Sequence, residues 1–268
     1  MSSVVKNIDS TQDVRRRVSA AEWEARVQLA ACYRLVAHYG WTDLIYTHIS
    51  ARVPGPENHY LLNPFGMMFH EITASSLVKI DVDGNIVDPT PHRIHKAGFI
   101  IHSAVHAARE DAHCVIHSHT RAGMALSMMK CGLLPLTQHA MLFHGRVGYH
   151  DSEGFALETD ERKRIAVNLG KNCVLILRNH GTLVAGSSVP EAFSMMWHLE
   201  KAMQAQIDGM ASGQELTVPS QAVAEQTARM GFTSEPVLQY TEGMSPLGRL
   251  EWPALTRMLD AMDPSYRN

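Results

Sequence analysis

The sequence predicts a mixed α/β protein in which helices cover a central β-sheet. Short apolar runs, such as those at residues 114–117 and 173–177, have the length and composition of buried strands. Longer segments around them carry apolar residues every three or four positions, a period typical of helices that pack one face on a sheet. Strands mixed with helices in this way indicate an α/β sandwich.

Two helix starts are marked by capping boxes. Ser19 and Glu22, and likewise Ser188 and Glu191, have the spacing at which a hydroxyl and a carboxylate satisfy each other's free backbone amides. We expect the first helix to end at Gly40 and the second to reach about residue 208. Further helices are expected over residues 94–109, 122–130, 159–169 and 253–262.

The remaining structure is predicted to be strands, turns and two less ordered ends. We expect a polar, partly ordered arm over residues 1–18, one α/β domain over 19–210, and a linker-like tail over 211–268 that carries a last helix. Strands are expected over residues 46–53, 59–62, 77–82, 114–117, 173–177 and 182–185.

Composition excludes several classes of partner. The chain has 268 residues, is 45% hydrophobic and carries a formal net charge of −3, so nothing favours nucleic acid or an anionic membrane. No apolar run approaches the roughly 18 residues of a membrane span, and the first ten residues lack an apolar signal core. We expect a cytoplasmic protein. Its cysteines form no CxxC pair and are expected to be buried free thiols: Cys32, Cys114, Cys131 and Cys173.

Two of the sixteen histidines stand close together in CVIHSHT. Side chains alternate along a strand, so His117 and His119 point to one face while Ser118 points to the other. Two imidazoles on one face can share a zinc or iron ion. The alternative is a pair of exposed polar histidines at a strand end. Cys114 has the opposite parity and is a poor ligand candidate.

His180 follows the second buried strand and precedes Gly181, where the chain has to turn. If the two strands are close in the sheet, His180 completes a set of three histidines. Three neutral imidazoles leave coordination positions open, which is typical of a catalytic site and not of a structural one. The alternative is that Asn179-His180-Gly181 is only a turn.

Several ordered motifs resemble the class II aldolase/adducin family: CVIHSHT, LRNHG, LLNPFGMMFHEITASSLVKIDVDGN, IIHSAVHAARED and the helix over 188–208. The resemblance spans roughly residues 22–210. It implies a three-layer sandwich, usually tetrameric, with sites near subunit interfaces. It also implies one divalent metal per subunit, zinc first and iron or manganese next, held by His117, His119 and His180.

The chain departs from the family's sugar-phosphate aldolases at two places. Their metal-binding and proton-transferring glutamate falls at Gly98, and a glycine can do neither. Their Gly-Asn phosphate turn is replaced by Thr47-His48, so small residues that let backbone amides approach an anion are lost. Cleavage of a sugar phosphate is therefore not expected.

Other residues are candidates for the missing roles. The proton-transfer candidates are Glu71, His102 and His139; His102 shares one face of the 94–109 helix with His95 and His106. A polar helix face, a subunit contact or a surface turn are the alternatives for these positions. The substrate-binding candidates are His48, Asn63, Gly66, His70 and Tyr149.

The leading hypothesis is a metal-dependent lyase that acts on a small non-phosphorylated carbonyl or carboxylate compound, by carbon–carbon cleavage or decarboxylation. Loss of CO₂ needs no proton abstraction by the missing glutamate. One alternative is a non-haem Fe(II) oxygenase that decarboxylates an aromatic acid. Another is a non-catalytic, adducin-like binding module. A small-molecule substrate and a homotetramer are expected, the latter also because methionines line helix stripes.

Overall fold

The structure is a computed structural model that describes residues 10–55, 58–154, 160–231 and 247–268. Within this part, one sheet has the strand order β3-β2-β1-β4-β7-β6-β5. All neighbouring strands are antiparallel except the parallel pair β5 and β6. The strands are β1 (His48–Arg52), β2 (Tyr60–Leu62), β3 (Val78–Ile80), β4 (Cys114–Ser118), β5 (Val147–His150), β6 (Val174–Leu177) and β7 (Gly181–Gly186).

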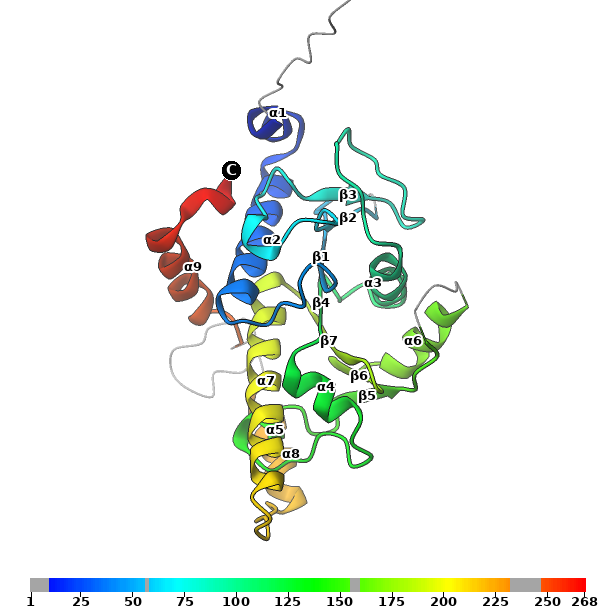
Figure 1. The fold of residues 1–268 in the computed structure, drawn as a ribbon, viewed down its shortest axis with the longest axis vertical. Helices are drawn as coiled ribbons and strands as arrows, with labels where there is room; N and C mark the ends of the chain where they lie inside the picture. The colour runs from blue at the N-terminus through cyan, green and yellow to red at the C-terminus, as the bar shows by residue number, and fades with distance from the viewer. Residues whose placement is uncertain (1–9, 56–57, 155–159, 232–246) are drawn as a thin grey trace, which may run out of the picture.

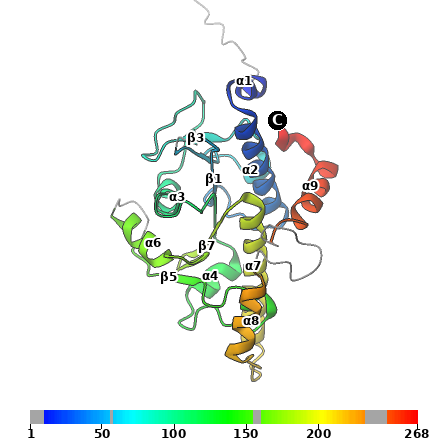
Figure 2. The ribbon, with the colours of Figure 1, turned by 180° about the vertical axis from the view of Figure 1, so that it is seen from behind.

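Helices cover both faces of this sheet. α2 and α7 form a column along one face, and α3 and α6 lie on the other (Figures 1 and 2). The helices are α1 (Ser10–Arg17), α2 (Ala20–His38), α3 (Lys96–Ala108), α4 (Arg121–Ser127), α5 (Gln138–Met141), α6 (Glu161–Leu169), α7 (Val189–Ala211), α8 (Gln221–Gly231) and α9 (Glu251–Met262), with short 3₁₀ turns η1 (Phe69–Glu71) and η2 (Pro264–Arg267). The predicted three-layer α/β class is confirmed.

The alternation of side chains along the strands divides the core in two. Ile116 and Val184 pack with α2 and α7, whereas Val115 and Leu183 pack with α3 and α6. Strands that are apolar on both faces are expected where helices cover both sides. This explains why the central strands look like continuous apolar runs in the sequence.

The predicted helix starts are correct, but only half of each capping box forms. The hydroxyls of Ser19 and Ser188 accept from the backbone amides of Glu22 and Glu191, at 3.1 and 3.3 Å. The Glu22 carboxylate instead binds the Arg26 guanidinium, 2.9 Å away. The Glu191 carboxylate accepts from the amide of the residue before the cap. Both carboxylates therefore stabilise contacts beyond the first helical turn.

The predictions for the chain ends were partly wrong. Residues 221–231, expected to be linker, form α8, whose buried Ala224 and Ala228 give only a narrow apolar stripe. α9 and η2 pack on α2 and bury Trp252 and Tyr266 in the main core. β5 and α5 were not predicted, and the arm contains α1. Residues 1–9 of the arm, residue 159 of a predicted helix and residues 232–246 of the tail lie outside the described part.

The cysteine prediction also needs correction. Cys32 and Cys114 are buried, Cys173 is half-buried and Cys131 is exposed, and all four are free thiols. Cys131 lies after α4 in a connection that the sequence had not marked as surface. None of the helices in the described ranges is long and apolar enough to cross a membrane.

A buried histidine cluster fastens α3 to β1. The Ser50 hydroxyl lies 2.6 Å from Nδ1 of His102 and 2.7 Å from Nε2 of His106. Nδ1 of His106 donates to the carbonyl oxygen of Ala112, at 2.9 Å, and the His106 ring stacks on Tyr60. Burial lowers the pKa of His106 to about 3. His106 is therefore uncharged in the folded protein at neutral pH.

This burial predicts a pH dependence of stability. Unfolding returns the pKa of His106 from about 3 toward about 6.5, so the unfolded chain binds one more proton between these values. The stability contributed by neutral His106 is present above about pH 6.5 and is lost as the pH falls through this window. We expect H106Q to be less stable at pH 7 but to lose stability less steeply toward pH 5, by the contribution of about one proton.

Urea unfolding at pH 7, 6 and 5 measures this slope. The control is H38Q, because His38 is exposed and is not among the groups that lower the pKa of His106. An H106Q slope equal to that of the parent chain would show that His106 is not held neutral.

Candidate metal centre

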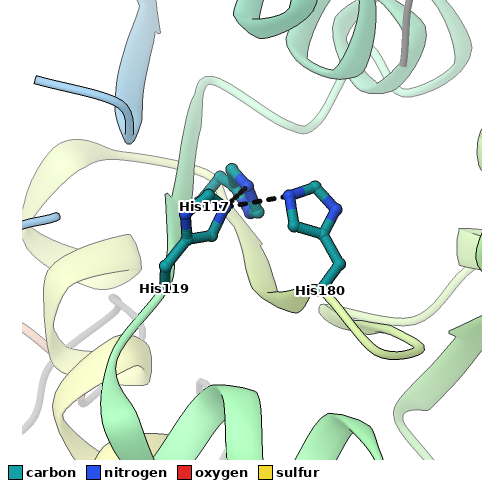
Figure 3. Close-up of side chains that lie close together, drawn as sticks. All are labelled: His117, His119 and His180. Carbon is teal, nitrogen blue, oxygen red and sulfur yellow. Dashed lines mark hydrogen bonds between the residues drawn. The ribbon is translucent and has the colours of Figure 1, made fainter. Parts of the chain in front are cut away.

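Three histidines converge where β4 ends and β7 begins (Figure 3). His117 lies in β4, His119 follows the end of β4, and His180 occupies the turn between β6 and β7. Nε2 of His119 lies 2.9 Å from Nε2 of His117 and 2.9 Å from Nε2 of His180. β4 and β7 are antiparallel neighbours with Ser118 opposite Thr182. The strand pairing thus brings together ligand candidates that are 61 residues apart in the chain.

The turn that presents His180 depends on its two neighbours. Asn179 has a φ of 57°, in the left-handed region that asparagine tolerates better than most residues. Gly181 packs so closely against β4 that an added Cβ would collide with the carbonyl oxygen of Ser118. The Asn-His-Gly order is therefore what allows the chain to reverse this close to β4.

Two of the imidazoles are oriented through their other nitrogen. Nδ1 of His117 donates to the carbonyl oxygen of Thr182 at 3.0 Å, and Nδ1 of His119 donates to Oδ2 of Asp43 at 2.9 Å. In a neutral imidazole, a protonated Nδ1 leaves a lone pair on Nε2. A ligating histidine typically donates its second nitrogen to a carbonyl or carboxylate in this way.

The donor set fits a divalent cation. Burial, followed by the neighbouring histidines, lowers the pKa of His180 to about 4 and that of His117 well below its usual value. The His117 and His180 rings are therefore neutral at neutral pH, and lone pairs that converge at 2.9 Å repel each other unless a cation lies between them. Zinc, iron and manganese all accept imidazole nitrogen. Among the described residues, this is the group that could hold an ion.

Two predicted site residues lie beside the three histidines. His48 is the residue of β1 directly opposite His117 of β4, and the two rings are nearly parallel, with centroids 6.3 Å apart. His102 meets the His48 ring edge-on at 5.9 Å. His95 stacks on the other side of His48, at 5.3 Å. The face of the sheet that carries His117 is therefore lined by imidazoles.

The structure gives four other candidates local roles. The Glu71 carboxylate accepts from the Met68 amide in η1, and His70 beside it is exposed. Gly66 forms an exposed turn with a φ of 102°. Asn63 is buried, and its Oδ1 accepts from the Tyr33 hydroxyl that bridges β1 and β2. None of them joins the three histidines.

His139 and Tyr149 lie in other surroundings. The His139 ring packs on His198 of α7, with centroids 5.0 Å apart. The Tyr149 hydroxyl accepts from the Leu133 amide, and the Arg178 guanidinium lies over its ring. Within one chain, these two residues therefore build the contacts of α5 and β5. Their predicted roles at a site shared between subunits stay predictions.

Sequence reasoning missed the residues that orient the histidines. Asp43 is 76 positions from His119, and a lone aspartate after a helix gives no signal of its own. Glu200 was missed as well: its carboxylate accepts from the Thr120 hydroxyl at 2.7 Å and so ties the residue after His119 to α7. Burial raises the pKa of Glu200. The other carboxylate oxygen of Glu200 accepts from Gln204, one turn further along α7, at 2.9 Å.

Replacement of His119 tests the centre. We expect one divalent ion per chain in the parent protein and none in H119A, because Nε2 of His119 lies next to both of its partners. D43A should bind about 10–100-fold more weakly, since it loses only the orienting contact. Elemental analysis after equilibrium dialysis against Zn²⁺ measures both, with H113A as the exposed-histidine control. Full occupancy in H119A would overturn the ligand assignment.

Comparison with known proteins is consistent with this geometry. Residues 27–207 match the model of the Class II Aldolase and Adducin N-terminal domain. An aldolase II superfamily protein from Pseudomonas syringae has a similar structure, with a TM-score of 0.87 and 49% identity, covering 95% of this chain and 99% of that one.

Two further relatives differ in the kind of protein they are. L-fuculose 1-phosphate aldolase from Glaciozyma antarctica has a TM-score of 0.79 and 28% identity, over 93% of this chain and 94% of that one. Alpha-adducin of Rattus norvegicus is 44% identical over 88% of this chain, but the match covers only 33% of the adducin. The extent of the domain match and the level of these identities show that the chain belongs to the class II aldolase/adducin family.

Proposed function

We propose that this chain is a metal-dependent lyase that acts on a small, non-phosphorylated carbonyl or carboxylate compound, by carbon–carbon cleavage or decarboxylation. The observation that carries the proposal is the convergence of three Nε2 atoms, with two of the rings fixed through Nδ1. Three protein ligands leave room for a substrate in the coordination sphere. Zinc is the ion that we expect, with iron or manganese as the alternatives.

The chain's own residues would hold and orient the reacting groups. His117, His119 and His180 would hold the ion, while Asp43 and the Thr182 carbonyl keep two of the rings in place. When bound, a divalent ion supplies Lewis-acid polarisation of a carbonyl and stabilises negative charge that develops as a carbon–carbon bond breaks. His102, held by Ser50, packs against His48 and supports the wall beside His117.

Two features favour a substrate without phosphate. Position 98 is glycine, so this chain lacks a carboxylate where the resemblance places the proton-transferring glutamate. Thr47 and His48 are both buried at the start of β1, so their side chains fill the region that the resemblance assigns to a phosphate turn. The likeness to an L-fuculose 1-phosphate aldolase makes sugar-phosphate cleavage the reaction that most needs a direct test.

Turnover of sugar phosphates tests this proposal. We expect negligible cleavage of L-fuculose or L-rhamnulose 1-phosphate by the metal-loaded chain, because loss of a positioned base typically costs about 10²–10⁴ in rate. An aldehyde-release assay with an authentic fuculose-phosphate aldolase as control measures it. Turnover near 1 s⁻¹, which is ordinary for an enzyme, would show that the chain is a sugar-phosphate aldolase.

A non-catalytic binding module is the second candidate, and the 44% identity to alpha-adducin favours it. The two functions differ in what the histidines do. A lyase needs them to bind an ion that a small ligand can reach, whereas a binding module does not. Stoichiometric metal binding that does not respond to any small carbonyl or carboxylate compound would favour the adducin-like function.

We also propose a homotetramer. The Met-rich stripe of α7 does not support it, since Met195, Met196 and Met203 are buried in the chain's own core. Better support comes from exposed apolar side chains in the two segments that meet at His119. Leu44 follows Asp43, and Met128 ends the α4 segment that begins after His119; each side chain is 62% exposed.

Light scattering should give about four times the 29.8 kDa chain mass. L44D should lower the average mass, because a buried unpaired charge opposes association. V167D is the matched control: Val167 on α6 is 77% exposed and lies outside the two segments. A monomeric parent chain at micromolar concentration would contradict the proposal.

A further inference from the structure

His48 is a buried polar side chain without a hydrogen-bond partner in the described part of the chain. It is 5% exposed, and neither of its ring nitrogens is within reach of a donor or acceptor. Buried polar groups in native proteins are nearly always paired, so an exception of this kind points to a function.

The ring lies in space that a side chain at position 98 would need. A Cβ built on Gly98 would lie 2.5 Å from Cδ2 and 2.6 Å from Nε2 of His48. Gly98 is an ordinary helical residue of α3 and has no positive φ, so the backbone conformation does not demand a glycine. Glycine is required here because of His48, since this ring and a side chain at position 98 cannot occupy the same space.

His102 holds the ring from a second side, and its hydrogen bonds fix its tautomer. Nδ1 of His106 must donate to the Ala112 carbonyl, so its Nε2 accepts from the Ser50 hydroxyl. Ser50 has no second proton, so Nδ1 of His102 donates to it. Nε2 of His102 is then a bare acceptor, and it has no partner in the described chain. The wall beside His117 therefore carries neutral nitrogens.

The consequence is electrostatic. Among the described residues, no carboxylate belongs to the group of possible ligand atoms that the three histidines form. The Asp43 carboxylate accepts a hydrogen bond from Nδ1 of His119, on the side of the ring away from the other two histidines. It is 44% exposed, so solvent screens its charge. A divalent ion held by neutral imidazoles would keep nearly its full charge, and charges in buried sites are usually paired.

We infer that this arrangement, with the His48 ring in the space that a side chain at position 98 would need, selects a substrate that brings its own carboxylate to the metal. The fitting class is a 2-oxo or 2-hydroxy acid, whose two neighbouring oxygens can share the open positions of the ion. This inference rests on the proposed function and narrows its substrate class. A neutral carbonyl compound would leave the positive charge unpaired.

The probe is oxalate, tested on the Co²⁺-loaded parent chain by visible absorption and calorimetry. We expect oxalate to shift the cobalt bands and to bind at least ten-fold more tightly than dihydroxyacetone, a neutral compound of similar size, and than inorganic phosphate. Equal binding of oxalate and dihydroxyacetone would overturn the inference. Tighter binding of phosphate would also overturn it.

Two matched double variants isolate the charge at this position. H48A/G98E removes the ring and places a carboxylate in the cleared space, whereas H48A/G98Q places a neutral amide of nearly the same size there. We expect H48A/G98E to keep cobalt and to bind oxalate at least ten-fold more weakly than H48A/G98Q. Equal oxalate affinities in two folded, cobalt-loaded variants would overturn the inference.

The failure of this inference is distinguishable from failure of the proposed function. If the parent chain binds cobalt and oxalate leaves the spectrum unchanged, the carboxylate preference is wrong and the metal site stands. If H119A binds cobalt as well as the parent chain does, the histidine site itself is wrong, and the inference falls with it. Thermal unfolding of each variant verifies that a lost response is not a lost fold.

Discussion

The antiparallel pairing of β4 with β1 on one side and β7 on the other is the constraint on which the site depends. One register places His48 opposite His117, and the other places Thr182 opposite Ser118, with His180 two positions before Thr182. A slip of one residue in either pair would turn these side chains to the opposite face of the sheet. The register is held by wholly buried apolar residues on both faces of β4, such as Val115 and Ile116. Core packing therefore sets the geometry of the centre.

Sequence reasoning recovered the regular, apolar parts of the fold and failed where the signal is weak. The central strands follow from short apolar runs, because helices cover both of their faces, and α2, α3 and α7 follow from apolar residues at helical spacing, because each packs an apolar face on the sheet. α8 was not predicted, because its buried residues are two small alanines that give only a weak apolar pattern. The polar, linker-like stretch before it, which contains Gly213 and Pro219, masked a helix that packs on α5.

The centre shows the same division. His117 and His119 could be proposed from strand parity, and His180 from its place after a second buried strand, since each signal lies within a few residues. Asp43, Ser50 and Glu200 could not, because their roles arise only when distant segments meet. The loss of a side chain at Gly98 was visible in the sequence. What fills its place, the His48 ring, is a property of the folded sheet.

The hydrogen bond from His117 to the Thr182 carbonyl joins β4 to β7. Likewise, the left-handed Asn179 and the close-packed Gly181 serve the chain reversal that connects β6 to β7. The histidine centre and the sheet thus share parts, and a descendant that lost the chemistry would still be selected to keep much of the motif for folding. The same residues thus serve the folding of the sheet and the geometry of the centre.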